Sequence, residues 1–85
     1  MEQRYSLNNK IQILREAGVF EENACWFAIE LLSEREIVRE KVNGETQKAI
    51  ARKRGVNVGS INRVLEKNLS AMAVRFIQLH TDKFK

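Results

Sequence analysis

The residues that could do chemistry gather in one stretch of the chain, between Thr46 and Leu65. Their side chains are cations, amides and a hydroxyl, which are the groups that bind phosphates and the edges of bases. No acidic residue lies between Glu45 and Glu66, whereas a purely structural pair of helices should place Glu beside Lys on its exposed face. The stretch therefore predicts a surface for a polyanion, formed by Gln47, Lys48, Arg52, Lys53, Arg54, Asn57, Ser60, Asn62 and Arg63.

The charge of the chain is distributed unevenly, although the net charge of +4 is modest. Residues 1–43 hold six basic and eight acidic side chains, a net charge of −2, whereas residues 44–85 hold nine basic and three acidic ones, a net charge of +6. The positive charge is thus concentrated in the half that contains the cationic stretch. Such asymmetry is typical of a protein with a polyanionic partner.

Residues suited to catalysis or metal binding are scarce. His80 and Cys25 are each the only residue of their type, and one histidine with one cysteine cannot form a tetrahedral metal site. Cys25 lies in the apolar run NACWFAIELL near acidic residues, which indicates an inert core thiol. We see no phosphate-binding glycine loop, signal peptide or membrane span. We therefore expect a cytoplasmic protein that is not an enzyme and that binds no cofactor or metal.

The cationic stretch should form two short helices joined by a tight turn, near Thr46–Arg54 and Val58–Lys67. Helices that cross steeply after a short turn need a small residue where their axes approach, and Ala51 supplies it. Gly55 accepts the positive φ that such a turn requires, and Val56 is expected to fill the space beneath the turn.

The same two helices carry signals for their caps and for their buried face. Thr46 and Asn57 are suitable N-caps for the first and second helix. Ile61 should point into a small core between the helices, and Val64 and Leu65 extend its apolar stripe at helical spacing. The polar residues are then left on the outer face.

The residues of this helix pair resemble those of the helix-turn-helix in bacterial DNA-binding regulators. Four positions carry the resemblance through their small or apolar types and their spacing, Ala51, Gly55, Val56 and Ile61. The run GVNVGSINRVL is similar to the second half of that motif in Trp-repressor-like proteins and in the promoter-reading domains of sigma factors. The preceding run LLSEREIVREKVNGE resembles the helix that leads into the motif in the Trp-repressor-like group, although it is shorter here.

The resemblance implies a sequence-specific, double-stranded DNA-binding transcriptional regulator, a repressor that occupies a promoter in a bacterium, plasmid or phage. The helix Val58–Lys67 would enter the major groove with its N-terminal end toward the bases. Reading an operator usually takes two copies spaced by about one DNA turn, roughly 34 Å, so a module of this size would act as a homodimer or with tandem partners. The residues closest to DNA would be Asn57, Val58, Gly59, Ser60, Asn62 and Arg63.

The chemistry of each side chain suggests its contact. Asn62 suits adenine N6 and N7, and Arg63 suits either guanine O6 and N7 or a phosphate oxygen. Gln47 and Lys48, at the start of the first helix, suit a phosphate. Gly59 either lets the backbone approach DNA closely or is a first-turn residue without a contact. Three further cations either contact phosphates or belong to a solvated face: Arg52, Lys53 and Arg54.

The rest of the chain is predicted to be helical as well, because it has no proline and little glycine. A first helix should run from its cap Ser6 to Gly18. A second helix, near residues 21–32, should be the most buried element because apolar residues nearly encircle it. A third should begin at a capping box, Ser33–Glu36, and end at Asn43–Gly44.

After residue 67, apolar side chains continue at helical spacing, so residues 69–83 either form a sixth helix or continue the fifth. The sequence thus predicts an all-α fold, a small bundle of five or six helices that contains a helix-turn-helix at residues 46–67. A single domain would span residues 1–85. The N-terminal helices at residues 6–43 and the C-terminal helix at residues 69–83 would serve as scaffold and dimerisation surface.

Two other interpretations remain open. The same helices can form a protein-binding module, such as an antitoxin, an anti-activator or a docking subunit. The run LNNKIQILREAGVFEEN also resembles the start of a regulatory helical domain of antiterminators linked to sugar transport, in which a histidine is phosphorylated. That second similarity is generic, and its boundaries disagree with those of the helix pair.

Overall fold

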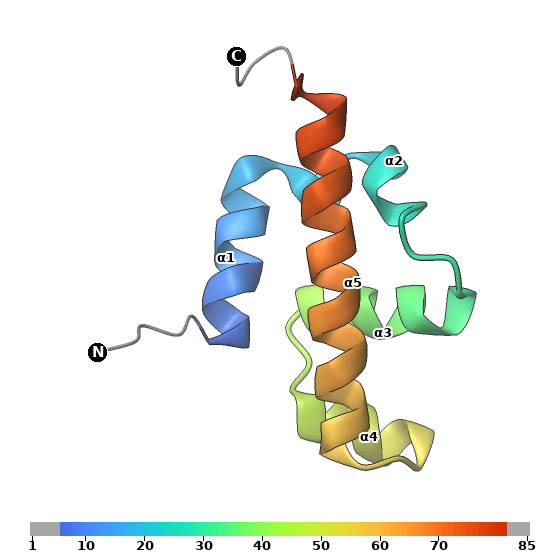
Figure 1. The fold of residues 1–85 in the computed structure, drawn as a ribbon. Coiled ribbons are helices and arrows are strands. Elements are labelled where there is room, and N and C mark those ends of the chain that lie inside the picture. Colours follow the sequence, from blue (N-terminus) through green and yellow to red (C-terminus); the bar gives the residue numbers. More distant parts are fainter. Residues whose placement is uncertain (1–5, 82–85) are drawn as a thin grey trace.

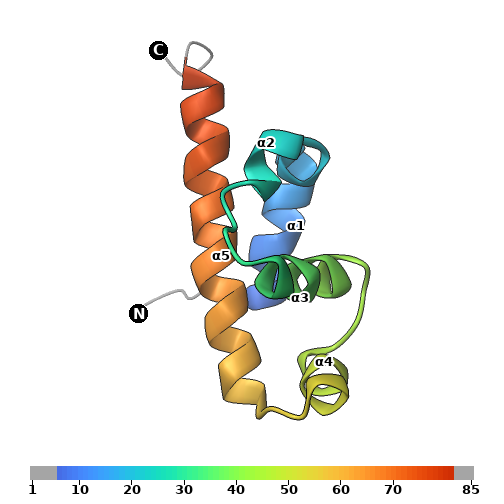
Figure 2. The ribbon, with the colours of Figure 1, turned by 90° about the vertical axis from the view of Figure 1, so that its right-hand side faces the viewer.

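One long helix, α5 (Val58–Leu79), runs the height of the molecule (Figure 1). Figure 2 shows that the other helices all lie on one side of it. The computed structural model describes residues 6–81, and in this range every regular element is helical, as the sequence predicts. Before α5 the chain forms α1 (Leu7–Ala17), a 3-10 turn (Val19–Glu21), α2 (Asn23–Trp26), α3 (Leu32–Val42) and α4 (Gln47–Arg54).

Short-range bonds set the ends of three helices, as predicted. Ser6 Oγ accepts a hydrogen bond from the backbone N–H of Asn9 at 3.2 Å, and Gly18 ends α1 with a φ of 89°. The backbone N–H of Ala49 donates to Thr46 Oγ1 at 3.1 Å, and that of Ser60 donates to Asn57 Oδ1 at 2.9 Å. These side chains satisfy N–H groups that have no partner within the first turn of a helix.

The prediction of a long second helix near residues 21–32 is wrong. α2 is a single turn, and the chain then follows an irregular path through residues 27–31 before α3 begins. Arg35 holds this segment, because its Nη2 donates to the carbonyl oxygen of Ile29 at 2.7 Å. The apolar run is therefore divided rather than wrapped around one helix. Cys25, Trp26 and Ile29 are buried, whereas Phe27, Leu31 and Leu32 are 70%, 58% and 68% exposed.

The capping box predicted at Ser33–Glu36 does not form. α3 begins at Leu32, so Ser33 is the second residue of the helix and does not occupy the N-cap position. The N-cap is Leu31, which makes no side-chain cap bond. The other end agrees with the prediction, because Asn43 is the C-cap of α3.

α5 is one continuous helix, so of the two alternatives for residues 69–83 the continuation of the fifth helix is the correct one as far as Leu79; residues 82–83 lie outside the described range. Its 22 residues span about 33 Å at 1.5 Å per residue. The buried face of α5 packs against α2, α3 and α4. The main side chains of this core are Ile61, Leu65, Leu69 and Met72 from α5, with Val19, Ile29, Val38 and Ile50 from the other elements and their connections.

One polar side chain, Asn68, is buried beside this core. Its Nδ2 donates to Glu34 Oε1 at 3.1 Å and to the carbonyl oxygen of Val64 at 2.9 Å, so it links α5 to α3. The hydrogen bond from Asn68, followed by contacts with Lys67, holds the pKa of Glu34 below its ordinary value even though burial opposes this.

Candidate nucleic-acid interface

α4 lies across the foot of α5, and residues 55–57 join the two helices (Figure 1). Gly55 has a φ of 68°, the left-handed conformation expected of it, and the N–H of Val56 donates to the carbonyl oxygen of Ala51 at 3.0 Å. Ala51 and Ile61 are buried where the helices meet, as predicted. We call residues 46–63 the α4–α5 corner.

The expectation that Val56 fills the space beneath the turn is wrong, because this side chain is 45% exposed. Its backbone bond to Ala51 closes the end of α4 and leaves the side chain on the outer side of the turn. Val58, two residues later, is half-buried and packs against the core instead.

The first two turns of α5 are open to solvent on their polar side. Asn62 and Arg63 are exposed, and neither makes a side-chain hydrogen bond or an ion pair with any residue in the range 6–81. The burial of Ile61 and Leu65 fixes the orientation of the helix and keeps these neighbours outside. Of the other residues predicted to lie closest to a duplex, Asn57 and Gly59 are exposed, and Val58 and Ser60 are half-buried.

Two of the predicted contact residues are bonded to each other. Asn57 Oδ1 accepts both the backbone N–H of Ser60, at 2.9 Å, and its hydroxyl, at 3.2 Å. The amide nitrogen of Asn57 is thus the part that remains to donate outward. Ser60 Oγ, whose proton is used, keeps lone pairs that can accept. A bidentate contact with adenine needs a donor and an acceptor, so Asn62 suits this contact better than Asn57 does.

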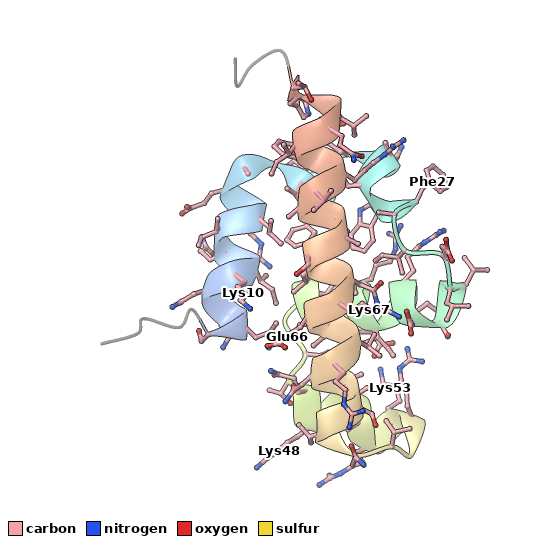
Figure 3. All side chains as sticks on the ribbon, viewed as in Figure 1. Lys10, Phe27, Lys48, Lys53, Glu66 and Lys67 are labelled. Atoms are coloured by element: carbon pink, nitrogen blue, oxygen red, sulfur yellow. The ribbon has the colours of Figure 1, made fainter. Side chains whose placement is uncertain are left out.

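At the start of α4, Gln47 is oriented by a residue from α3. Lys41 Nζ donates to Gln47 Oε1 at 3.0 Å, so the amide oxygen is occupied and the amide N–H groups remain as donors. Such a group suits a phosphate oxygen. The next residue, Lys48, extends away from the foot of the molecule on the side where α1 lies (Figure 3). Lys48 and Arg52 are exposed and have no ion pair within residues 6–81.

The expectation of a cationic face without acidic compensation is wrong at the end of α4. Lys53 Nζ lies 3.4 Å from Glu40 Oε1 and 3.4 Å from Glu45 Oε2. Arg54 Nη2 lies 2.6 Å from Glu40 Oε2 and 3.8 Å from Glu36 Oε2. The acids come from α3 and from the loop that follows it, so they are absent from the cationic stretch in the sequence but adjacent to it in space.

The pKa values of this cluster reflect the same contacts. The hydrogen bond to Glu45, and then the charge of Glu40, raise the pKa of Lys53 above its ordinary value. Burial would raise the pKa of Glu40, but the hydrogen bonds and charges of Arg54 and Lys53 together outweigh it and lower that pKa. Lys53 is thus charged at neutral pH, and the charges of Lys53 and Arg54 are both offset by carboxylates of the fold.

A sequence signal for this cluster exists and points to α3. Glu36 and Glu40 are four residues apart, so they share one face of a helix, and Glu40 and Glu45 flank the point where α3 ends. The charged face of α3 could have been anticipated on this basis. Its position against α4 depends on the packing of Val38 against the core and has no local signal.

The remaining chemically reactive residues lie apart from the corner. Cys25 is fully buried, and burial, with a smaller contribution from Glu22, raises the pKa of its thiol. His80 Nε2 lies 3.2 Å from Glu22 Oε1 near the far end of α5. In residues 6–81, no group of three or more His, Cys, Asp or Glu side chains is placed to hold a metal ion.

Comparisons of the chain with protein-family models, with curated proteins and with solved structures find no match. Within residues 6–81 none of the helices combines the length and the apolar character needed to cross a membrane. The function of the α4–α5 corner has to be inferred from its own residues and geometry.

Proposed function

We propose that this chain is a sequence-specific, double-stranded DNA-binding regulator of transcription and that the α4–α5 corner acts as a helix-turn-helix. The observation that supports this most directly is the placement of Asn62 and Arg63. They are adjacent, exposed and without partners in residues 6–81, and they lie on the second turn of a helix whose N-terminal end is at one extremity of the molecule. An amide and a guanidinium so placed can read base edges.

In this proposal the first two turns of α5 enter the major groove. Asn62 bonds adenine N6 and N7, and Arg63 bonds guanine O6 and N7 or, if it lies at the groove edge, a phosphate. Asn57 donates to the backbone, and Ser60 accepts from an exocyclic amino group. Val58 and Gly59 lie against the sugar edge or a thymine methyl group.

The first turn of α4 and its exposed cations contact the phosphates on one flank of the groove. Gln47 presents N–H donors, and Lys48 and Arg52 supply charge that is not offset by an ion pair in residues 6–81. Lys53 contributes less, because two carboxylates already hold its ammonium group. Arg54 is a structural residue in this proposal.

Two copies of the chain form the functional unit. One good bidentate contact favours the correct base over a wrong one by about 1–3 kcal/mol. A single short recognition helix makes few such contacts, so one copy of the chain would select its site only weakly. A homodimer doubles these contacts if its two corners are about one DNA turn apart, roughly 34 Å. Occupancy of a near-palindromic promoter site would then exclude polymerase, so we propose a repressor.

Selection of bound duplexes from a random pool tests the proposal, together with the solution mass of the free and bound protein. We expect a short near-palindromic site and binding that weakens steeply with salt.

Arg63→Ala should weaken binding to the selected site by roughly 5-fold to 150-fold, and binding to unrelated duplex by much less, if Arg63 reads a base. Arg75→Ala, with the same charge change near the far end of α5, is the control. The proposal fails if the wild-type chain binds no duplex at low salt, or if Asn62→Ala with Arg63→Ala leaves affinity unchanged.

A protein-interaction module is the second candidate, and one observation favours it. Phe27, Leu31 and Leu32 place large apolar side chains in solvent beside α3. A docking partner would cover them, and its affinity would respond to Phe27→Ala but not to Arg63→Ala. Salt would affect such binding only weakly.

A further inference from the structure

A groove between α1 and the end of α3 adjoins the α4–α5 corner and shares with it only Thr46. Its volume is about 330 Å³. No acidic residue lines it, although α1 and α3 belong to the acidic half of the chain. We call it the α1–α3 groove; its lining residues are Asn8, Ile11, Gln12, Arg15, Lys41, Gly44 and Thr46.

The two cations of the groove, Arg15 and Lys41, are fixed by hydrogen bonds, and each has further N–H groups that can donate. Arg15 donates from Nη2 to the carbonyl oxygen of Val42 at 2.7 Å and from Nη1 to Gln12 Oε1 at 3.3 Å. Lys41 donates one of its three N–H groups to Gln47. Neither cation has a carboxylate within ion-pair distance among residues 6–81, in contrast to Lys53. A positioned guanidinium and ammonium without an internal counter-ion suit an anion of the phosphate type.

The groove adjoins the start of α4. Thr46 lines it and is also the N-cap of α4, and Lys41 in the groove wall bonds Gln47 on the first turn. Lys48 leaves the foot of the molecule on the same side as α1 (Figure 3). A DNA phosphate bound by Gln47 would therefore lie beside the groove.

We propose that the α1–α3 groove binds a backbone phosphate of the same duplex that the α4–α5 corner reads, with Arg15 and Lys41 as its ligands. The inference rests on the proposed function and extends it, because it assigns a DNA contact to helices otherwise regarded as scaffold. These contacts touch no base, so they set the orientation of the protein on DNA and contribute affinity that is independent of sequence.

The dependence of duplex affinity on salt tests this assignment. Lys41→Gln and Arg15→Gln each remove one charge while keeping an N–H donor, and Arg75→Gln is the matched control. We expect the slope of log K against log [salt] to become shallower by about 0.9 for each groove variant and to be unchanged for the control. At 0.1 M salt each groove variant should bind roughly tenfold more weakly, to selected and unrelated duplexes alike. Lys41→Arg should keep the wild-type slope, and circular dichroism melts establish that every variant is folded.

The outcomes separate the two proposals. Unchanged slopes for both groove variants, with wild-type DNA binding intact, overturn the groove assignment and leave the proposed function standing. Failure of the wild-type chain to bind duplex overturns both. A third arm adds inorganic phosphate and follows the amide resonances of Gly44 and Thr46. If phosphate alone shifts them as much as duplex does while the salt slopes stay equal, the groove takes free phosphate and the DNA assignment is overturned.

Discussion

Arg54 Nη2 lies 2.6 Å from Glu40 Oε2 and joins the last turn of α4 to the last turns of α3. The two side chains are 23% and 21% exposed, so this is a partly buried, charge-assisted hydrogen bond. It holds α4 in position while leaving the N-terminal turns of α4 and α5 open.

We expect Arg54→Ala to reduce the free energy of unfolding by about 1.5–3 kcal/mol, the range for a hydrogen bond to a charged group. Lys53→Ala removes ion pairs to Glu40 and Glu45, but its side chain is 56% exposed and solvent screens both pairs, so it should cost clearly less than Arg54→Ala. Thermal melts followed by circular dichroism measure both, since each kcal/mol corresponds to about 4–8 °C in a domain of this size. Equal losses in the two variants would contradict the structural role given to Arg54.

The stability of the fold should decrease in acid. The pKa values of Glu34 and Glu40 are lower in the folded chain than their ordinary values, so the unfolded chain binds more protons as the pH decreases. Their contribution is complete above the unfolded pKa of about 4.3 and is lost as the pH falls through the folded values. Urea unfolding at a series of pH values measures this. Glu40→Gln should make the acid limb shallower, and an unchanged limb in this variant would contradict the prediction.

Gly55→Ala should destabilise the chain, because the glycine has a φ of 68° and an alanine pays about 1–2 kcal/mol for that conformation. Nothing lies within 4 Å of the position of a Cβ there, so the penalty comes from the backbone rather than from a clash. Gly55→Asn should cost less, because asparagine tolerates the left-handed region better. Chemical denaturation of the three proteins gives the comparison, and identical midpoints would show that the turn does not require glycine.

Gly59→Ala should separate stability from DNA binding. Gly59 is helical, and a Cβ at this position would meet only Asn57 Oδ1, at 3.4 Å, so alanine should stabilise the helix by up to about 1 kcal/mol. If the backbone of Gly59 approaches a sugar or a thymine methyl, the same methyl group should weaken duplex binding. Melting temperature and duplex affinity are measured on one preparation. A more stable variant with wild-type affinity would place Gly59 outside the contact.

Those parts of the fold that depend on neighbouring residues could be predicted from the sequence. The side chains of Ser6, Thr46 and Asn57 cap their helices by accepting the backbone N–H of the residue three positions later. Gly18 and Gly55 adopt the expected left-handed conformation. The exposure of Asn62 and Arg63 follows from the helical stripe of Ile61 and Leu65. In each case the decisive spacing is four residues or fewer.

The features that the sequence did not predict depend on contacts across the fold. The apolar run at residues 24–32 has too many hydrophobic residues to indicate a face, and the irregular segment that interrupts it accepts a hydrogen bond from Arg35 at Ile29. The ion pairs of Lys53 and Arg54 join residues 8 to 18 positions apart, which a scan for acids within the cationic stretch cannot find. The sequence left the continuity of α5 open, and in the fold Leu69 and Met72 are buried on a helix that packs against α2 and α3.

Because a single helix serves both the exposed corner and the buried core, the corner is not an autonomous module. A peptide restricted to residues 46–67 would lose Leu69 and Met72, together with the support that Val38 and Ile29 give to the same helix. Short isolated helices are marginal in water, so such a fragment would fray and its recognition turns would have no fixed orientation. Grafting or minimising this surface therefore requires the whole of α5 and the helices that pack against it.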